Sequence, residues 1–253
     1  ILMIVAPLWF GYSGYPIVTD NFFIFSAIGG IAQILATLCV IALFKQRNFA
    51  VGIAFKKTET LQIAVISLVI LGEKVSINAL CAICIGFVGL VLLSKQPLKR
   101  SFLEEGVLSR SVFLGLLSGF LFAISGVYYR ASTLNVLDES SINRAIFTLT
   151  FVLVFQVISM GGWLLLFNRR ELKAVWKVRS VAIWVGLTSL AGSFCWFWAF
   201  SLVNAALVKA VGQIELLFSI LASIVLFKEK ITGRELVGIF TVMVSLIGVI
   251  ALG

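Results

Sequence analysis

Apolar runs of about 20 residues alternate with short polar breaks along the whole chain. A run of this length is what an α-helix needs to cross the hydrocarbon core of a bilayer. We expect residues 1–13 to be the tail of a further span. No signal peptide is visible and Ile1 already lies in an apolar run, so the start looks cut. The pattern predicts full spans at residues 22–44, 50–71, 76–94, 112–131, 145–167, 180–202, 205–227 and 234–253, about nine spans with the tail.

Composition agrees with this pattern and excludes a soluble domain. The 253 residues are 61% hydrophobic and only 12% charged, which predicts an all-α polytopic membrane protein. The net charge of +9 does not indicate nucleic acid, because the basic residues gather in short connections that typically face anionic lipid. We expect the bilayer as a partner, and a multi-pass protein of the bacterial inner (plasma) membrane. The basic connections are residues 45–47, 95–110, 169–179 and 228–234.

The residue types available for chemistry are few. The chain has no histidine, which removes the commonest metal ligand and the usual base at neutral pH. Cys81 and Cys84 lie within an apolar span, where we expect them to be small buried side chains without a redox or metal role. We expect no catalytic residues, no metal and no cofactor, and therefore no enzyme.

The chain carries an internal duplication. A shift of 156 positions superposes residues 48–74 on 204–230 and aligns Glu59 with Glu215. It also aligns Asn48 with Asn204, two residues that precede helices and are expected to be N-caps. An odd number of spans in each repeat makes the two copies enter the membrane from opposite sides, an inverted duplication. The predicted domains are 1–94, the first repeat without its first helix and part of its second; 95–111, a linker; and 112–253, the second repeat.

Three segments carry a resemblance to a known family: "GEKVS", "KEKIT" and the closing "GRELVGIFTVMVSLIGVIAL". With five-plus-five spans, they resemble the drug/metabolite transporter superfamily, in particular its EamA-type ten-helix branch. The resemblance covers essentially the whole chain. It implies two inverted five-helix repeats that move small metabolites, amino acids or amphipathic compounds across a cytoplasmic membrane. The first helix, expected to line the cavity, is missing from this chain.

Two carboxylates are predicted near the middle of the bilayer. Glu59 lies nine residues into its span, about 14 Å deep. Glu215 lies at a similar depth, and half of a hydrocarbon core is about 15 Å. An ionised group there costs about 2.5–3.5 kcal/mol, so both glutamates should face water, a partner or a cavity.

Further polar residues share these two spans. Lys56 is three residues from Glu59 and can pair with it, whereas Lys57 aligns with Gln213, which follows Lys209 by four residues. Two interpretations stay open. The ion pairs hold the halves together, or they border a central cavity where lysines bind an anionic group of the substrate and Glu59 or Glu215 carries a proton. Gln33, Tyr129 and Trp196 are additional candidates for lining residues.

The function expected from these features is secondary active transport of a small-molecule substrate by alternating access at a midplane cavity. Coupling to protons and exchange are both open, as is a homodimer. No nucleotide-binding G-x-x-x-x-G-K-[ST] loop occurs. The alternatives are an intramembrane enzyme acting on lipid-linked substrates, and a non-catalytic channel or partner subunit. Orientation is in conflict: the basic loops place Gly253 outside, and the resemblance places both chain ends inside.

Overall fold

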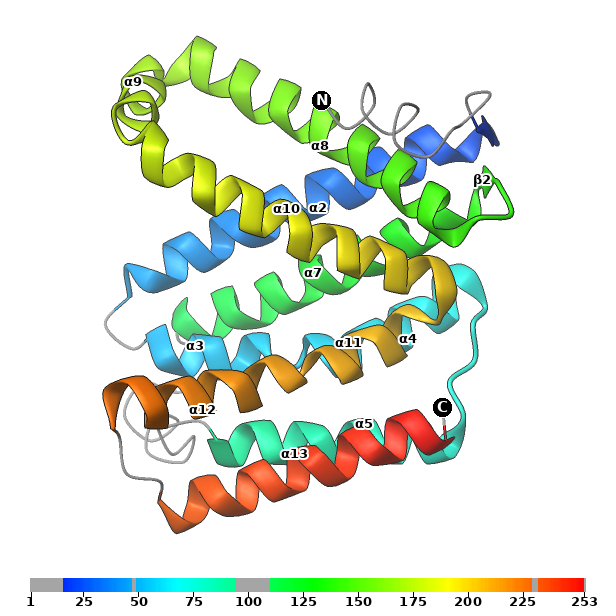
Figure 1. The fold of residues 1–253 in the computed structure, drawn as a ribbon, viewed down its shortest axis with the longest axis vertical. Helices are drawn as coiled ribbons and strands as arrows, with labels where there is room; N and C mark the ends of the chain where they lie inside the picture. Colours follow the sequence, from blue (N-terminus) through cyan, green and yellow to red (C-terminus); the bar gives the residue numbers. More distant parts are fainter. Residues whose placement is uncertain (1–15, 47–48, 94–109, 229–231, 253) are drawn as a thin grey trace. The chain divides into compact units, whose positions relative to one another are not determined.

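The computed structural model describes residues 16–46, 49–93, 110–228 and 232–252, and helices make up most of them (Figure 1). A short strand, β1 (Ile17–Val18), pairs antiparallel with β2 (Val136–Leu137). The helices are α2 (Asn21–Phe44), α3 (Phe49–Lys56), α4 (Glu59–Leu71), α5 (Ile77–Leu93), α7 (Arg110–Leu134), α8 (Ser141–Phe167), α9 (Arg169–Lys177), α10 (Arg179–Leu202), α11 (Ala205–Gly212), α12 (Ile214–Phe227) and α13 (Gly233–Leu252).

Five helices within the described residues are long and apolar enough to cross a membrane, namely α2, α7, α8, α10 and α13. The apolar α5 is shorter. These helices confirm an all-α polytopic membrane protein. An α-helix can cross the hydrocarbon core because it satisfies its backbone N–H and C=O groups internally. The duplication and the number of spans stay predictions. The predicted tail at 1–13 and most of the linker, 95–109, lie outside the described residues.

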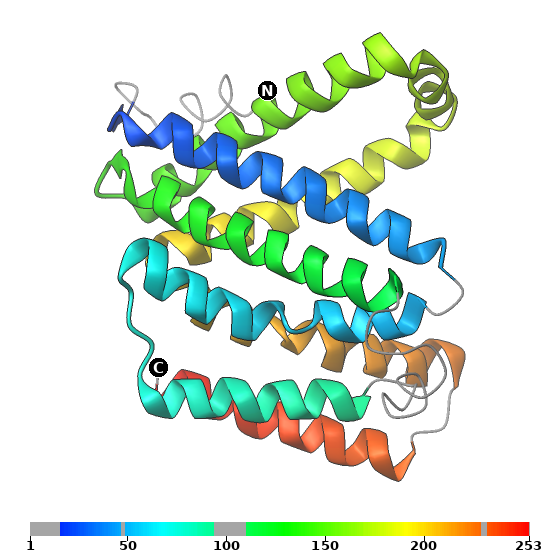
Figure 2. The ribbon, with the colours of Figure 1, turned by 180° about the vertical axis from the view of Figure 1, so that it is seen from behind.

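The prediction of unbroken helices at 50–71 and 205–227 was wrong. One helix ends at Lys56 and the next begins at Glu59, and the second break falls between Gly212 and Ile214 (Figure 2). At each break a backbone N–H bonds to the carbonyl three residues back, which tightens the turn: Lys57 N lies 3.2 Å from Ala54 O, and Gln213 N lies 3.2 Å from Ala210 O.

Local side-chain chemistry explains the first break. Thr58 Oγ1 donates to Phe55 O at 2.7 Å and accepts from Gln62 Nε2 at 2.8 Å. A threonine that bonds to the preceding turn competes with regular helical hydrogen bonding. The two breaks centre on Lys57 and Gln213, which are 156 positions apart, the same shift that aligns the two halves of the sequence.

A helix also occupies a connection that the sequence predicted only as a basic loop. The nine-residue α9 joins α8 to α10, and Arg179 stacks on the ring of Trp176 at 5.6 Å. Arg169 and Arg170 lie at its start, and Trp176 is exposed. A short helix rich in arginine with an exposed tryptophan is typical of a helix lying on the membrane surface.

The chain divides into two compact units, each described separately. Unit 1 comprises residues 1–34 and 128–203, and unit 2 comprises 35–127 and 204–253. In unit 1, α8 packs against α10 and next to β2. In unit 2, α5 lies beside α13 in both views, and α4 packs against α11. Each unit therefore combines segments from both predicted repeats.

Small residues allow α5 and α13 to approach closely. A Cβ atom at Gly89 would lie 3.0 Å from the backbone N of Val242 and 3.1 Å from Gly238 O. Ser245 Oγ donates to Ala82 O at 2.6 Å across the same interface. Close backbone contact of this kind drives helix association in lipid, where apolar burial supplies little.

Replacing Gly89 by alanine should weaken this interface, since the new methyl group meets backbone atoms that cannot move aside. We expect the free energy of unfolding to fall by about 1–3 kcal/mol. The control is Gly192→Ala in α10, where a Cβ atom meets nothing within 4 Å. Unfolding by SDS in mixed micelles, followed by circular dichroism, compares the two; equal midpoints would contradict the packing described.

Candidate functional site

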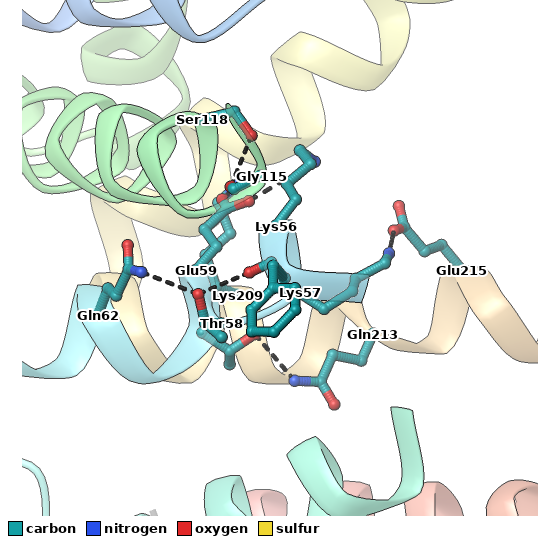
Figure 3. Close-up of polar contacts among 12 residues, drawn as sticks. Lys56, Lys57, Thr58, Glu59, Gln62, Gly115, Ser118, Lys209, Gln213 and Glu215 are labelled. Carbon is teal, nitrogen blue, oxygen red and sulfur yellow. Dashed lines mark hydrogen bonds and ion pairs between the residues drawn. The ribbon is translucent and has the colours of Figure 1, made fainter. Parts of the chain in front are cut away.

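The ionisable residues of the two broken helices come together in unit 2 (Figure 3). Lys209 Nζ lies 2.8 Å from Glu59 Oε1, and Lys56 Nζ lies 3.7 Å from Glu59 Oε2. The Lys56–Glu59 pair expected from their spacing is therefore present, and a third residue from the other broken helix joins it. We call Lys56, Glu59 and Lys209 the Glu59 triad.

A second ion pair joins the same two broken helices. Lys57 Nζ lies 3.1 Å from Glu215 Oε1. Glu59 of α4 thus pairs with Lys209 of α11, and Glu215 of α12 pairs with Lys57 from the first break. Burial separates the two carboxylates: the Glu59 side chain is 11% exposed and the Glu215 side chain is 61% exposed.

The breaks place each charge at a helix end that favours it. Glu59 and Glu215 lie in the first turns of α4 and α12, where the partial positive charge of a helix N-terminus stabilises a carboxylate. Lys56 and Lys209 lie in the last turns of α3 and α11, where the partial negative charge favours an ammonium. Four charges therefore gain about 0.3–1 kcal/mol each from ends that an unbroken helix would lack.

Neutral groups complete the surroundings of these charges. Gln213 Nε2 donates to Thr60 Oγ1 at 3.0 Å, which links the second break to the start of α4. The Lys56 ammonium lies 4.6 Å from the centroid of the Phe122 ring, a cation–π contact. Thr60 was missed although it adjoins Glu59 in a polar stretch, and Phe122 of α7 gave no sequence signal.

Helix α7 supports the first break from outside. A Cβ atom at Gly119 would lie 2.9 Å from the Lys56 carbonyl oxygen, so only a glycine fits there without a shift. Ser118 Oγ in the same turn donates to Gly115 O at 2.8 Å. The backbone of α7 therefore fixes the position of the last residue of α3, and with it the Lys56 side chain.

Two of the predicted lining residues form a separate polar cluster in unit 1. The Tyr129 hydroxyl donates to Gln33 Oε1 at 2.5 Å, and Gln156 Nε2 donates to the same oxygen at 2.9 Å. Tyr129 packs on Phe197, with ring centroids 4.6 Å apart. Gln156 was missed, although an amide in an apolar run is a signal that could have found it.

The other predicted positions have more ordinary surroundings. Trp196 packs against Phe200, with ring centroids 6.0 Å apart. Asn204 is confirmed as the N-cap of α11, since its Oδ1 accepts from Ala206 N at 2.8 Å. Asn48 lies outside the described residues. Within the described ranges, no group of three histidine, cysteine or acidic residues could hold a metal ion.

More than half of the chain matches a known protein family. Residues 109–251, more than half of it, match the model of the EamA-like transporter family. The protein is therefore a membrane protein of a transporter class. It belongs to the EamA-like transporter family, within the drug/metabolite transporter superfamily.

A solved structure shows the same fold. That chain, titled "Crystal structure of protein", superposes with a TM-score of 0.68 at 16% identity, covering 99% of this chain and 83% of that one. No match was found among curated proteins.

Replacing each glutamate by glutamine should lower the free energy of unfolding by different amounts, because one ion pair is buried and the other is exposed. Glu59→Gln leaves two lysines without a carboxylate in a buried site, and should lower the free energy of unfolding by about 3 kcal/mol. Glu215→Gln removes a partner from an exposed pair and should cost less than about 1 kcal/mol. SDS titration in mixed micelles measures both, and equal losses would show that burial does not distinguish them.

Proposed function

We propose that this protein is a secondary active transporter that moves a small metabolite, amino acid or amphipathic compound by alternating access. The observation that carries the proposal is the pair of helix breaks 156 positions apart, whose charged ends pair crosswise. Discontinuous helices with charges at their ends are how many secondary transporters build a midplane site. Family membership supports the same class of function.

The two ion pairs differ in a way that suits such a cycle. The Lys57–Glu215 pair is exposed at its carboxylate. We assign that carboxylate to a water-filled cavity, where opening the pair costs little, about 0–1 kcal/mol. The Glu59–Lys209 pair is buried, and breaking it costs several times more. We assign the Glu59–Lys209 pair to holding α4 on α11 throughout the cycle. The Lys57–Glu215 pair opens and closes, and Glu215 takes up a proton when Lys57 leaves it.

Transport is tested with purified protein in liposomes. Vesicles preloaded with one unlabelled solute should transiently accumulate the same solute in labelled form. Labelled solute that enters on the carrier leaves slowly, because the excess of unlabelled solute inside competes with it for the carrier. The panel covers amino acids, nucleosides, organic acids and organic cations. Saturable counterflow supports a carrier, whereas non-saturable flux indicates a channel and the absence of any flux indicates an enzyme or partner subunit.

Replacing Glu215 by glutamine should uncouple transport from protons. We expect the variant to retain counterflow and to lose the accumulation that an imposed inward pH gradient drives in the parent protein. Phe218→Leu, a neutral change at an exposed position one turn further along α12, is the matched control. Gradient-driven accumulation that survives in Glu215→Gln would remove the proton role from this carboxylate.

A further inference from the structure

The charges at the helix breaks do not cancel, and the geometry of the excess points to a ligand. We propose that Lys56 binds the carboxylate of a monoanionic substrate, with Glu59 and Lys209 as the fixed floor of that site. The inference rests on the proposed transport function and names the substrate class for it.

Counting charges locates the excess. The broken helices bring together three lysines and two glutamates, so the group carries one net positive charge. Lys57 and Glu215 form a neutral pair, which leaves the positive charge in the Glu59 triad. An uncompensated charge among apolar helices costs about 2.5–3.5 kcal/mol on insertion scales. One substrate carboxylate brings the group to neutrality, whereas a dianion overshoots and a cation adds to the excess.

Distances assign that excess to Lys56 and not to Lys209. The Lys209 ammonium lies within hydrogen-bonding distance of Glu59, at 2.8 Å, but the Lys56 ammonium lies 3.7 Å away. Within the part of the chain that the structure describes, the Lys56 ammonium makes no hydrogen bond; its other contact is the face of Phe122, at 4.6 Å. An ammonium has three donors, and a π-face satisfies them less well than an anionic oxygen does.

The surroundings keep Lys56 ready for an anion. Its backbone is fixed by the contact of α7 at Gly119, and Phe122 on the same helix holds the ammonium by its ring. Glu59 carries one negative charge and cannot neutralise two lysines, and the closer of the two is Lys209. A carboxylate arriving beside Lys56 therefore exchanges a cation–π contact for charge-assisted hydrogen bonds and need not break the buried Glu59–Lys209 pair.

The first test compares acids with their amides, which have nearly the same shape and lack the charge. Benzoate and benzamide, phenylacetate and phenylacetamide, and N-acetylleucine and N-acetylleucinamide are the pairs. We expect at least one acid to raise the melting temperature of the purified protein and to bind about tenfold or more tightly than its amide. Binding of no acid in the panel, or equal binding of an acid and its amide, would overturn the inference.

Variants then place the effect on Lys56. Lys56→Gln should weaken binding of the acid about tenfold or more, whereas Lys56→Arg should restore most of it because the charge returns. Lys45→Gln, the same change at an exposed residue beyond α2, should leave binding unchanged. Acid binding that survives Lys56→Gln at parental affinity would also overturn the inference.

Counterflow experiments distinguish a failure of the carboxylate site from a failure of the proposed transport function. A carrier that exchanges only neutral or cationic solutes would keep the proposed function and overturn the carboxylate site. Acid binding that depends on Lys56, in a protein that shows no counterflow with any solute, would overturn the transport function and keep the site.

Discussion

One buried carboxylate, Glu59, pairs with lysines at the ends of both broken helices and links these helices within unit 2. A glutamate near the middle of a membrane is costly unless its charge is compensated. Glu59 is compensated three times: by Lys209 at 2.8 Å, by Lys56 at 3.7 Å, and by the N-terminal turn of its own helix. Without the break, Glu59 would lie in mid-helix and lose the third of these. The break therefore gives the Glu59 charge a stabilising helix end that an unbroken helix would lack.

The packing around the breaks then has a clear role. A broken helix has fewer internal hydrogen bonds and needs neighbours to hold its halves. Gly119 of α7 supports the first break, and Gln213 ties the second break to Thr60. Gly86 extends this support to α5, since a Cβ atom there would lie 2.9 Å from Gln213 Oε1. The closely packed α5 and α13 are thus both in contact with the second broken helix.

The extent of several long helices could be predicted from sequence, because bilayer thickness sets the length of a spanning helix. The predicted span 180–202 differs from α10 by one residue at its start. The Lys56–Glu59 pair and the Asn204 cap also followed from local spacing. The two breaks could not be predicted in this way, because neither helix contains a proline. At the first break Thr58 makes side-chain hydrogen bonds that no pattern of apolar residues encodes.

Contacts between distant segments were the least predictable part of the site. The partner of Glu59 lies 150 positions away in Lys209, and Phe122 reaches Lys56 from a third helix. Gln156 joined Gln33 and Tyr129 because three helices converge in unit 1, which apolar periodicity alone cannot show. The alignment of the two halves of the sequence gave the best indication of these contacts, since it placed Glu59 and Glu215 at equivalent positions.

Water access at position 215 decides whether the exposed Glu215 carboxylate faces an aqueous cavity or the lipid. In a background without Cys39, Cys81, Cys84 and Cys195, cysteine replaces Glu215 in one variant and the exposed Phe240 of α13 in another. We expect a membrane-impermeant thiol reagent to label position 215 in reconstituted vesicles and to leave position 240 unlabelled. If neither position is labelled and both react with a lipid-soluble reagent, Glu215 lies against acyl chains and the proposed aqueous cavity at the helix breaks is wrong.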